Sequence, residues 1–172
     1  MRTLRTLKPG QRGTKELQRQ HGASLLRVRY RYDEDTREHL KTVDLVVRRC
    51  PQCGDDPRKL RLNLRVGLSE ALANAMLYGN ASDPSKRVRV EVAFKGSTIT
   101  ARVTDQGSGF DPACVPDPTT PSNLLKAEGR GLFLMRKLLD EVYFNDLGNS
   151  VTLVLRLPPG LKNGGVEGGA VA

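Results

Sequence analysis

The sequence predicts an α/β two-layer sandwich, in which a mostly antiparallel, mixed sheet is covered by helices on one face. Two observations carry this prediction: apolar residues alternate with polar ones in several short segments, and they recur at helical spacing in longer ones. Helical and strand segments are interspersed along the chain, which is typical of such domains. With 172 residues, 38% hydrophobic and 27% charged, the chain suits one globular domain that needs neither a disulfide nor a metal to fold.

The two ends of the chain differ from its middle. Residues 1–22 contain Pro9 and three glycines but no sustained apolar period, which indicates a flexible leader. Residues 1–31 hold nine Lys or Arg and one acidic residue, which leaves 19 basic and 18 acidic residues in the rest. The positive charge is therefore concentrated near the N-terminus, and residues 32–172 are nearly neutral. We expect a basic leader over residues 1–22 and the folded domain over residues 23–158. The Gly-rich stretch over 159–172 indicates a disordered tail.

Charge and composition exclude some classes of function. A basic leader could neutralise the phosphates of nucleic acid or follow an acidic partner surface. It lacks the aromatic side chains of a single-strand binder, so a solvated leader is the simpler interpretation and nucleic acid is not the expected partner. The chain has no apolar run of about 18 residues, hence no expected membrane span. Three cysteines, an odd number, suit a reducing compartment, and we expect a cytoplasmic protein.

The first half of the domain is expected to contain one strand and two helices. Residues 25–30 alternate apolar and basic side chains, as a half-buried strand does. Residues 34–50 carry Leu40, Val43 and Val47 at helical spacing, which favours a helix, although a returning hairpin strand would also tolerate this segment. Asp56-Pro57 provides an N-cap and a first helical residue for a long helix that ends at Gly79.

The second half is expected to contain a hairpin, a loop, a helix and a final strand. Residues 88–94 and 98–103 alternate around a Lys-Gly-Ser turn and form an antiparallel hairpin. Residues 106–128 contain four prolines, and a connection of this length is usually a lid or a binding loop. A helix opens at Gly129 and carries apolar residues as far as Val142. Residues 151–157 form the last strand.

The long helix carries polar residues where an apolar face is expected. One narrow stripe, at 100° per residue, contains Asn63, Gly67, Glu70, Asn74 and Tyr78. Apolar residues flank this stripe on both sides, and an unpartnered carboxylate is costly to bury. Glu70 therefore either meets a protein partner or lines a cavity. Glycine within a helix costs about 1 kcal/mol relative to alanine, so Gly67 indicates close approach of a ligand or another backbone.

Two glycine motifs follow the helix. Asp105 stands at a strand end before Gly107 and Gly109, where its carboxylate could accept a hydrogen bond from an exocyclic amine and the glycines would admit a flat ring. Gly129 and Gly131 stand at a helix start, whose free N–H groups and positive dipole end favour phosphate. The chain contains neither a P-loop nor a complete Rossmann fingerprint.

In order along the chain, these motifs resemble the three nucleotide boxes of the histidine-kinase-like ATPase superfamily, which has the Bergerat fold. The resemblance covers about residues 23–158, and within the superfamily the chain most resembles the single-domain anti-sigma factor serine/threonine-protein kinases. The matching segments are Glu70-x-x-x-Asn74-x-x-x-Tyr78-Gly79, Asp105-x-Gly107-x-Gly109 and Gly129-x-Gly131-Leu132. The resemblance implies ATP-dependent phosphorylation of a serine on an anti-anti-sigma partner, together with capture of a sigma factor. It also implies a homodimer.

The resemblance also implies roles for single residues. Glu70 would act as general base on the incoming hydroxyl, Asn74 would help to hold Mg²⁺, and Asp105 would bind the adenine amino group of ATP. The remaining implied nucleotide-binding positions are Tyr78, Gly107, Gly109, Gly129, Arg130, Gly131 and Leu132. Tyr78 departs from the family pattern, because relatives commonly carry His there.

Other readings of the sequence remain open. The chain could be an ATP-binding switch that sequesters a partner without transferring phosphate, or a nucleic-acid-binding regulator that uses its basic leader. Cys50 and Cys53 form one Cys-x-x-Cys pair, but a zinc site needs four ligands, so two ordinary loop cysteines are the simpler interpretation.

Overall fold

The computed structural model of the chain describes residues 13–20, 23–31, 37–49, 57–123 and 129–156. Their strands form one six-stranded sheet in the order β1-β2-β3-β4-β6-β5, and every neighbouring pair is antiparallel. The strands are β1 (Gly13–Gln20), β2 (Ala23–Arg31), β3 (Arg87–Lys95), β4 (Thr98–Thr104), β5 (Glu141–Phe144) and β6 (Ser150–Arg156). The predicted fold class is confirmed, but the described sheet is antiparallel throughout rather than mixed.

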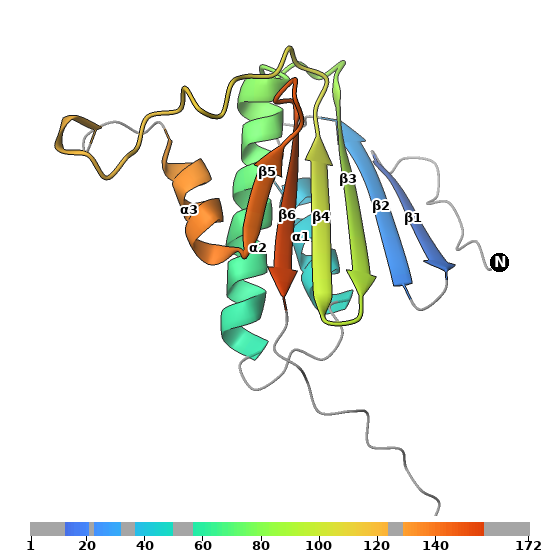
Figure 1. The fold of residues 1–172 in the computed structure, drawn as a ribbon. Helices are drawn as coiled ribbons and strands as arrows, with labels where there is room; N and C mark the ends of the chain where they lie inside the picture. Colours follow the sequence, from blue (N-terminus) through green and yellow to red (C-terminus); the bar gives the residue numbers. More distant parts are fainter. Residues whose placement is uncertain (1–12, 21–22, 32–36, 50–56, 124–128, 157–172) are drawn as a thin grey trace, which may run out of the picture.

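Helices gather on one face of this sheet (Figure 1). The described helices are α1 (Arg37–Arg49), α2 (Pro57–Ala73), the π-helix η1 (Asn74–Gly79), the 3₁₀ turn η2 (Pro121–Asn123) and α3 (Arg130–Leu138). Helix α1 confirms the helix expected over residues 34–50, so the alternative of a returning strand is wrong. Among the described residues, no helix combines the length and the apolar character needed to cross a bilayer.

The core lies between the sheet and the helices. Val88, Val90 and Val92 of β3 are buried while Arg87 and Arg89 beside them are exposed, which is the alternation of a half-buried strand. Helices α1 and α2 contribute buried residues to the same cluster, among them Val43, Val46, Leu64, Leu68 and Leu72. This packing fixes α2 against the sheet and so fixes the polar stripe that α2 carries.

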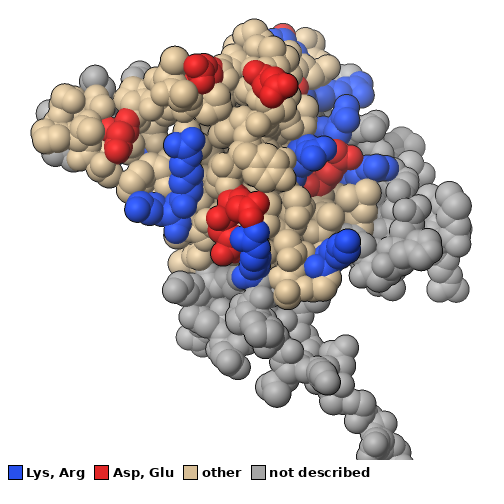
Figure 2. All heavy atoms as spheres, in the orientation of Figure 1, with Lys and Arg blue, Asp and Glu red and all other residues tan. Residues whose placement is uncertain are grey.

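The other face of the sheet is polar. Arg27 and Glu91 form an ion pair of 3.0 Å across β2 and β3, and Arg156 pairs with Glu141 across β6 and β5. Figure 2, which views the molecule with the strands in front of α1, shows basic and acidic side chains close together. Opposite charges thus pair between neighbouring strands of the sheet.

The expectation of a leader without regular structure fails over part of residues 1–22. Gly13–Gln20 forms β1, which pairs with β2 over its whole length. The segment GTKELQRQ contains a single large apolar residue, Leu17, so it shows no alternation. An edge strand can be held by main-chain hydrogen bonds without an apolar period. Residues 1–12 and the expected tail over 159–172 lie outside the described residues.

The helix expected from Gly129 to Val142 is shorter than predicted. Helix α3 ends at Leu138, Leu139 is extended (φ −114°, ψ 154°), and β5 follows. Leu139 and Val142 do pack on the core, but they reach it from extended backbone. Their spacing fitted a helix because residues three apart share a helix face, but Leu139 precedes β5 and Val142 lies within it, so the two do not belong to one regular element.

Candidate functional site

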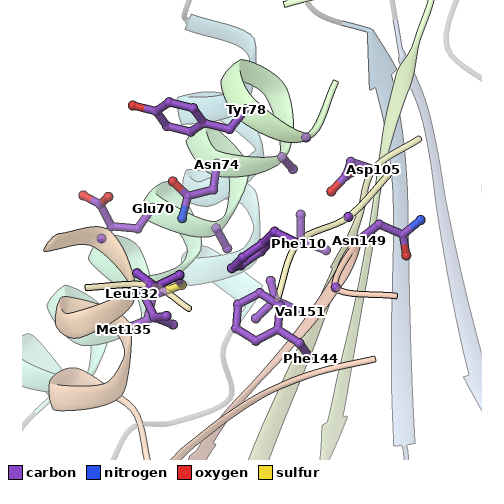
Figure 3. Close-up of a pocket in the computed structure, with 18 of the residues that line it drawn as sticks. Glu70, Asn74, Tyr78, Asp105, Phe110, Leu132, Met135, Phe144, Asn149 and Val151 are labelled. Atoms are coloured by element: carbon purple, nitrogen blue, oxygen red, sulfur yellow. The ribbon is translucent and has the colours of Figure 1, made fainter. Parts of the chain in front are cut away.

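A cavity of about 680 Å³ lies between α2, η1, α3, the ends of β4 and β6, and the segment that follows β4. This volume is in the range of small-molecule and cofactor sites. All but one of the site residues predicted from the sequence line it: Glu70, Asn74, Tyr78, Asp105, Gly109, Gly129, Arg130, Gly131 and Leu132. The exception is Gly107. Figure 3 shows Glu70 and Asn74 on the helix side and Asp105 on the strand side.

The polar stripe of the long helix serves two purposes. Its lower part contacts the end of α3: the Asn63 side-chain amide donates to the Leu138 carbonyl at 3.0 Å, and a Cβ at Gly67 would lie 2.7 Å from Leu139 Cδ1. Gly67 therefore does mark a close approach, by a side chain rather than by a ligand or a backbone. The upper part, which begins at Glu70, faces the cavity.

Glu70 and Asn74 are half-buried at the cavity wall. Neither makes a side-chain hydrogen bond to the part of the chain that the structure describes. Their polar groups are therefore available to a ligand, which is the arrangement expected of a lining carboxylate and carboxamide rather than of a structural pair.

The π-helix η1 changes the end of the stripe. The Asn80 N–H donates to the Ala75 carbonyl, five residues earlier, at 2.8 Å, so this turn is wider than an α-turn. Tyr78 lies at the rim of the cavity with 78% of its surface exposed, and Figure 3 shows its ring projecting away from Asp105.

Asp105 stands directly after β4. Its own N–H donates to the Asn149 carbonyl at 3.0 Å, and its Oδ1 accepts the Gly107 N–H at 2.7 Å. Partial burial raises the pKa of this carboxyl above its ordinary value, and the Gly107 N–H opposes that shift. A raised pKa at a cavity is typical of a functional carboxylate.

Two glycines, Gly79 and Gly107, let the chain fold closely around Asp105. A Cβ at Gly79 would lie 2.5–2.8 Å from the Asp105 carboxyl atoms, and a Cβ at Gly107 would overlap the Gly79 carbonyl oxygen. Gly107 therefore packs against Gly79 behind the cavity wall, and its role in nucleotide binding stays a prediction. Gly109 lines the cavity and has φ +79°, a conformation that only glycine adopts readily.

At the opposite end, the first turn of α3 meets Glu70 and Asn74. A Cβ at Gly131 would lie 2.7 Å from Glu70 Oε2 and 3.6 Å from Asn74 Nδ2. Gly129, the N-cap of α3, has φ +79°, and a Cβ there would overlap the Pro116 carbonyl oxygen. The free N–H groups of this helix start thus border the cavity beside a carboxylate and a carboxamide.

The structure adds residues that the sequence reasoning missed. Phe110 lines the cavity and meets Phe144 edge to face, with ring centroids 5.1 Å apart. Gly148 and Asn149, which directly precede β6 and were not among the predicted site residues, also line the cavity. A Cβ at Gly148 would overlap the Phe110 carbonyl, and one at Gly109 would overlap the Leu147 carbonyl. No local pattern signals this contact, because it joins loops about 40 residues apart.

The donors for a metal are limited. No group of three or more His, Cys, Asp or Glu that could hold a metal ion occurs among the described residues. Mg²⁺ is often bound by one or two protein oxygens together with substrate phosphates. The Asn74 carboxamide beside the α3 helix start fits that mode. Cys50 and Cys53 lie outside the described residues.

The sequence is similar to known ATPase domains and to two kinds of named relatives. Residues 34–155 match the family model described as "Histidine kinase-like ATPase domain". The anti-sigma F factor of Anoxybacillus flavithermus is 32% identical over 94 residues, which cover 53% of this chain and 64% of that protein. The serine-protein kinase RsbW of Listeria monocytogenes serotype 4a is 26% identical over 98 residues, 53% of this chain and 62% of the kinase. The chain thus spans less than two thirds of the length of these relatives.

Proposed function

The chain belongs to the histidine kinase-like ATPase family, and on that premise we propose that it is a protein kinase that binds ATP with Mg²⁺ and phosphorylates a serine of a partner protein. The observation that carries the proposal is the cavity that holds Asp105 at one end and Glu70, Asn74 and the α3 helix start at the other. This arrangement separates a place for a base from a place for phosphates.

Asp105 and the aromatic pair form the base-binding end. The Asp105 carboxylate faces the cavity (Figure 3). It accepts a hydrogen bond from the exocyclic amine of adenine, since an ionised carboxylate can only accept hydrogen bonds. Phe110, together with Val103 and Val151, offers an apolar surface for a flat ring. A guanine presents a carbonyl at the same position, so this end favours ATP over GTP.

Asn74 and the start of α3 form the phosphate end. The N–H groups of the first turn and the helix dipole stabilise negative charge. The Asn74 side-chain oxygen is the protein ligand that would hold Mg²⁺, and the ion when bound neutralises charge on the phosphates. Arg130, exposed at this end, adds a positive charge near the same phosphates.

Glu70 is the proposed general base. In the transfer step, the serine oxygen forms a bond to the γ-phosphorus, the bond from that phosphorus to the bridging oxygen breaks, and ADP leaves with the bond electrons. Glu70 accepts the serine proton. A positioned base of this kind contributes about 10²–10⁴-fold to a rate.

The partners proposed for this chain follow from the names of its relatives. Some relatives are named anti-sigma factors and others serine-protein kinases, which supports an anti-anti-sigma protein as the phosphate acceptor and a sigma factor as the sequestered partner. We also propose a homodimer in the cytoplasm.

The function can be tested with one carboxylate and one control. We expect Glu70→Gln to bind ATP normally, measured by calorimetry, and to lose about 10²-fold or more in phosphate transfer to the partner protein. Glu141→Gln removes a carboxylate that pairs with Arg156 outside the cavity and should transfer phosphate at the wild-type rate. ATP binding without any transfer by the wild-type protein would instead support a non-catalytic switch, and equal transfer by Glu70→Gln would remove Glu70 as the base.

A further inference from the structure

Asn80 is a fully buried polar residue directly after the π-helix η1. It has 0% relative exposure, and the only other buried polar residue in the described part of the chain is Thr152. Asn80 does not line the cavity. It is therefore a polar group in the interior that the proposed chemistry does not use.

The hydrogen bonds of Asn80 join two walls of the nucleotide cavity. Its Oδ1 accepts the Gln106 N–H at 2.8 Å, and Gln106 directly follows Asp105 in the chain. The Asn80 N–H ends η1 by donating to the Ala75 carbonyl at 2.8 Å. The residue thus links the end of the helix that carries Asn74 to the segment that carries Asp105.

This link is held in an unfavourable local structure. Asn80 Nδ2 is buried and has no hydrogen-bond partner in the described residues, and a buried unpaired donor is costly. Ala81 and Ser82, which follow it, both have positive φ (53° and 56°), which is strained for residues with a Cβ. Strain and unpaired groups that persist beside a binding cavity indicate that the arrangement serves the site.

The geometry around Asp105 shows what the link fixes. Gly79, the residue before Asn80, leaves no room for a Cβ beside the Asp105 carboxyl group. The Asp105 N–H donates a hydrogen bond to the Asn149 carbonyl and so holds Asp105 to the sheet. The next N–H, that of Gln106, donates to Asn80 Oδ1 and holds the chain to the end of η1. The position of the Asp105 carboxylate across the cavity therefore depends on both bonds.

We propose that Asn80 is a positioning residue that sets the Asp105 carboxylate at the distance from η1 needed to recognise the base of the nucleotide. The inference rests on the proposed function, in which Asp105 binds adenine. It assigns to Asn80 an effect on base recognition and none on phosphate binding, because the α3 helix start lies at the other end of the cavity.

The test compares a ligand that has a base with one that has none. Binding of ATP and of inorganic tripolyphosphate, each with Mg²⁺, is measured by calorimetry for the wild-type protein and for Asn80→Leu, which is similar in size but has no acceptor. We expect the Kd of ATP to rise about 10-fold, the equivalent of one hydrogen bond, and the Kd of tripolyphosphate to stay within about 2-fold. Hydrogen exchange of the Gln106 amide should become faster.

A matched control is Thr152→Val, which removes the other buried polar group. Its Oγ1 accepts from Arg102 on the far face of the sheet, so the ratio of the two affinities should not change. If Asn80→Leu does not fold, Asn80→Ser removes the same amide and leaves room for water, and the same selective loss is expected.

The outcomes separate this inference from the function beneath it. Equal ATP affinity in the wild-type protein and the Asn80 variants, or an equal loss for both ligands, would overturn the role of Asn80. A wild-type protein that binds ATP no better than tripolyphosphate would instead overturn base recognition by Asp105, and the proposed function with it.

Discussion

Replacing Gly131 by alanine tests whether the position of the Glu70 carboxylate controls catalysis. The new Cβ would lie 2.7 Å from Glu70 Oε2 and 3.6 Å from Asn74 Nδ2. Ordinary contact begins at about 3.4 Å, so Oε2 must move by about 0.7 Å while Asn74 stays in place. The Glu70 carboxylate is the end of a flexible, half-buried side chain, and we expect it to move rather than the backbone of α3.

The expected effect on rate is large and the effect on stability is small. A misplacement of about 1 Å can cost about 10²-fold in rate, so phosphate transfer should fall about 10- to 100-fold. Alanine is favoured over glycine within a helix by about 0.5–1 kcal/mol, so the free energy of unfolding should be unchanged or slightly higher. Transfer is measured with the partner protein and labelled ATP, and stability is measured by urea unfolding.

Gly67→Ala is the matched control on the neighbouring helix. It produces a contact of the same length, 2.7 Å, but with Leu139, a core side chain with only 7% of its surface exposed. Overpacking a core costs about 1–3 kcal/mol, which cancels or exceeds the gain of about 1 kcal/mol from replacing glycine by alanine in a helix. Gly67→Ala should therefore be less stable than Gly131→Ala and keep its rate per folded molecule. A Gly131→Ala protein with the wild-type rate would refute the view that Glu70 must be accurately placed. A loss of stability like that of Gly67→Ala would show that α3 moves instead.

Two further predictions concern the base-binding end. Asp105→Asn should weaken ATP binding about 10-fold or more, because it removes a charged acceptor, while the ligand-free protein becomes more stable at neutral pH. Burial raises the pKa of Asp105 above its ordinary value of 3.8, so above the raised pKa the ionised carboxylate destabilises the folded state. The difference in unfolding free energy between the variant and the wild-type protein should therefore shrink as the pH falls through the raised pKa toward 3.8. Urea unfolding at several pH values would measure this difference. Gly148→Ala forces a Cβ into the left-handed region (φ +78°) and onto the Phe110 carbonyl, so it should cost more than about 1–2 kcal/mol in unfolding free energy and weaken ATP binding. Wild-type affinity in either variant would count against this account of the base site.

The sequence predicted most of the fold because most elements carry a strong period. The hairpin of β3 and β4 and the long helix that begins at Pro57 were predicted from alternation and capping, which are local signals. Strand β1 was missed because an edge strand without an apolar face has no such signal. Strand β5 was missed because its four residues are fewer than a reliable period requires.

The candidate site was predictable where one residue carries the chemistry. Glu70 stood out as a carboxylate between apolar flanks, and Asp105 as an acid before two glycines. Gly107 and Gly109 have similar sequence contexts, and only the structure shows that Gly107 packs on Gly79 while Gly109 lines the cavity. Asn80 and Asn149 act through hydrogen bonds between distant segments, which a single sequence does not reveal.

The backbone contact between the loop after β4 and the β5–β6 turn has a practical consequence. Gly109 contacts the Leu147 carbonyl and Gly148 contacts the Phe110 carbonyl, so the backbone conformation of each loop restricts that of the other. A chimera that borrows either loop from a relative should therefore borrow both, and a library that randomises one of them should vary the other with it. Engineers who wish to alter nucleotide preference have two segments to redesign, and these segments must be treated as a single unit.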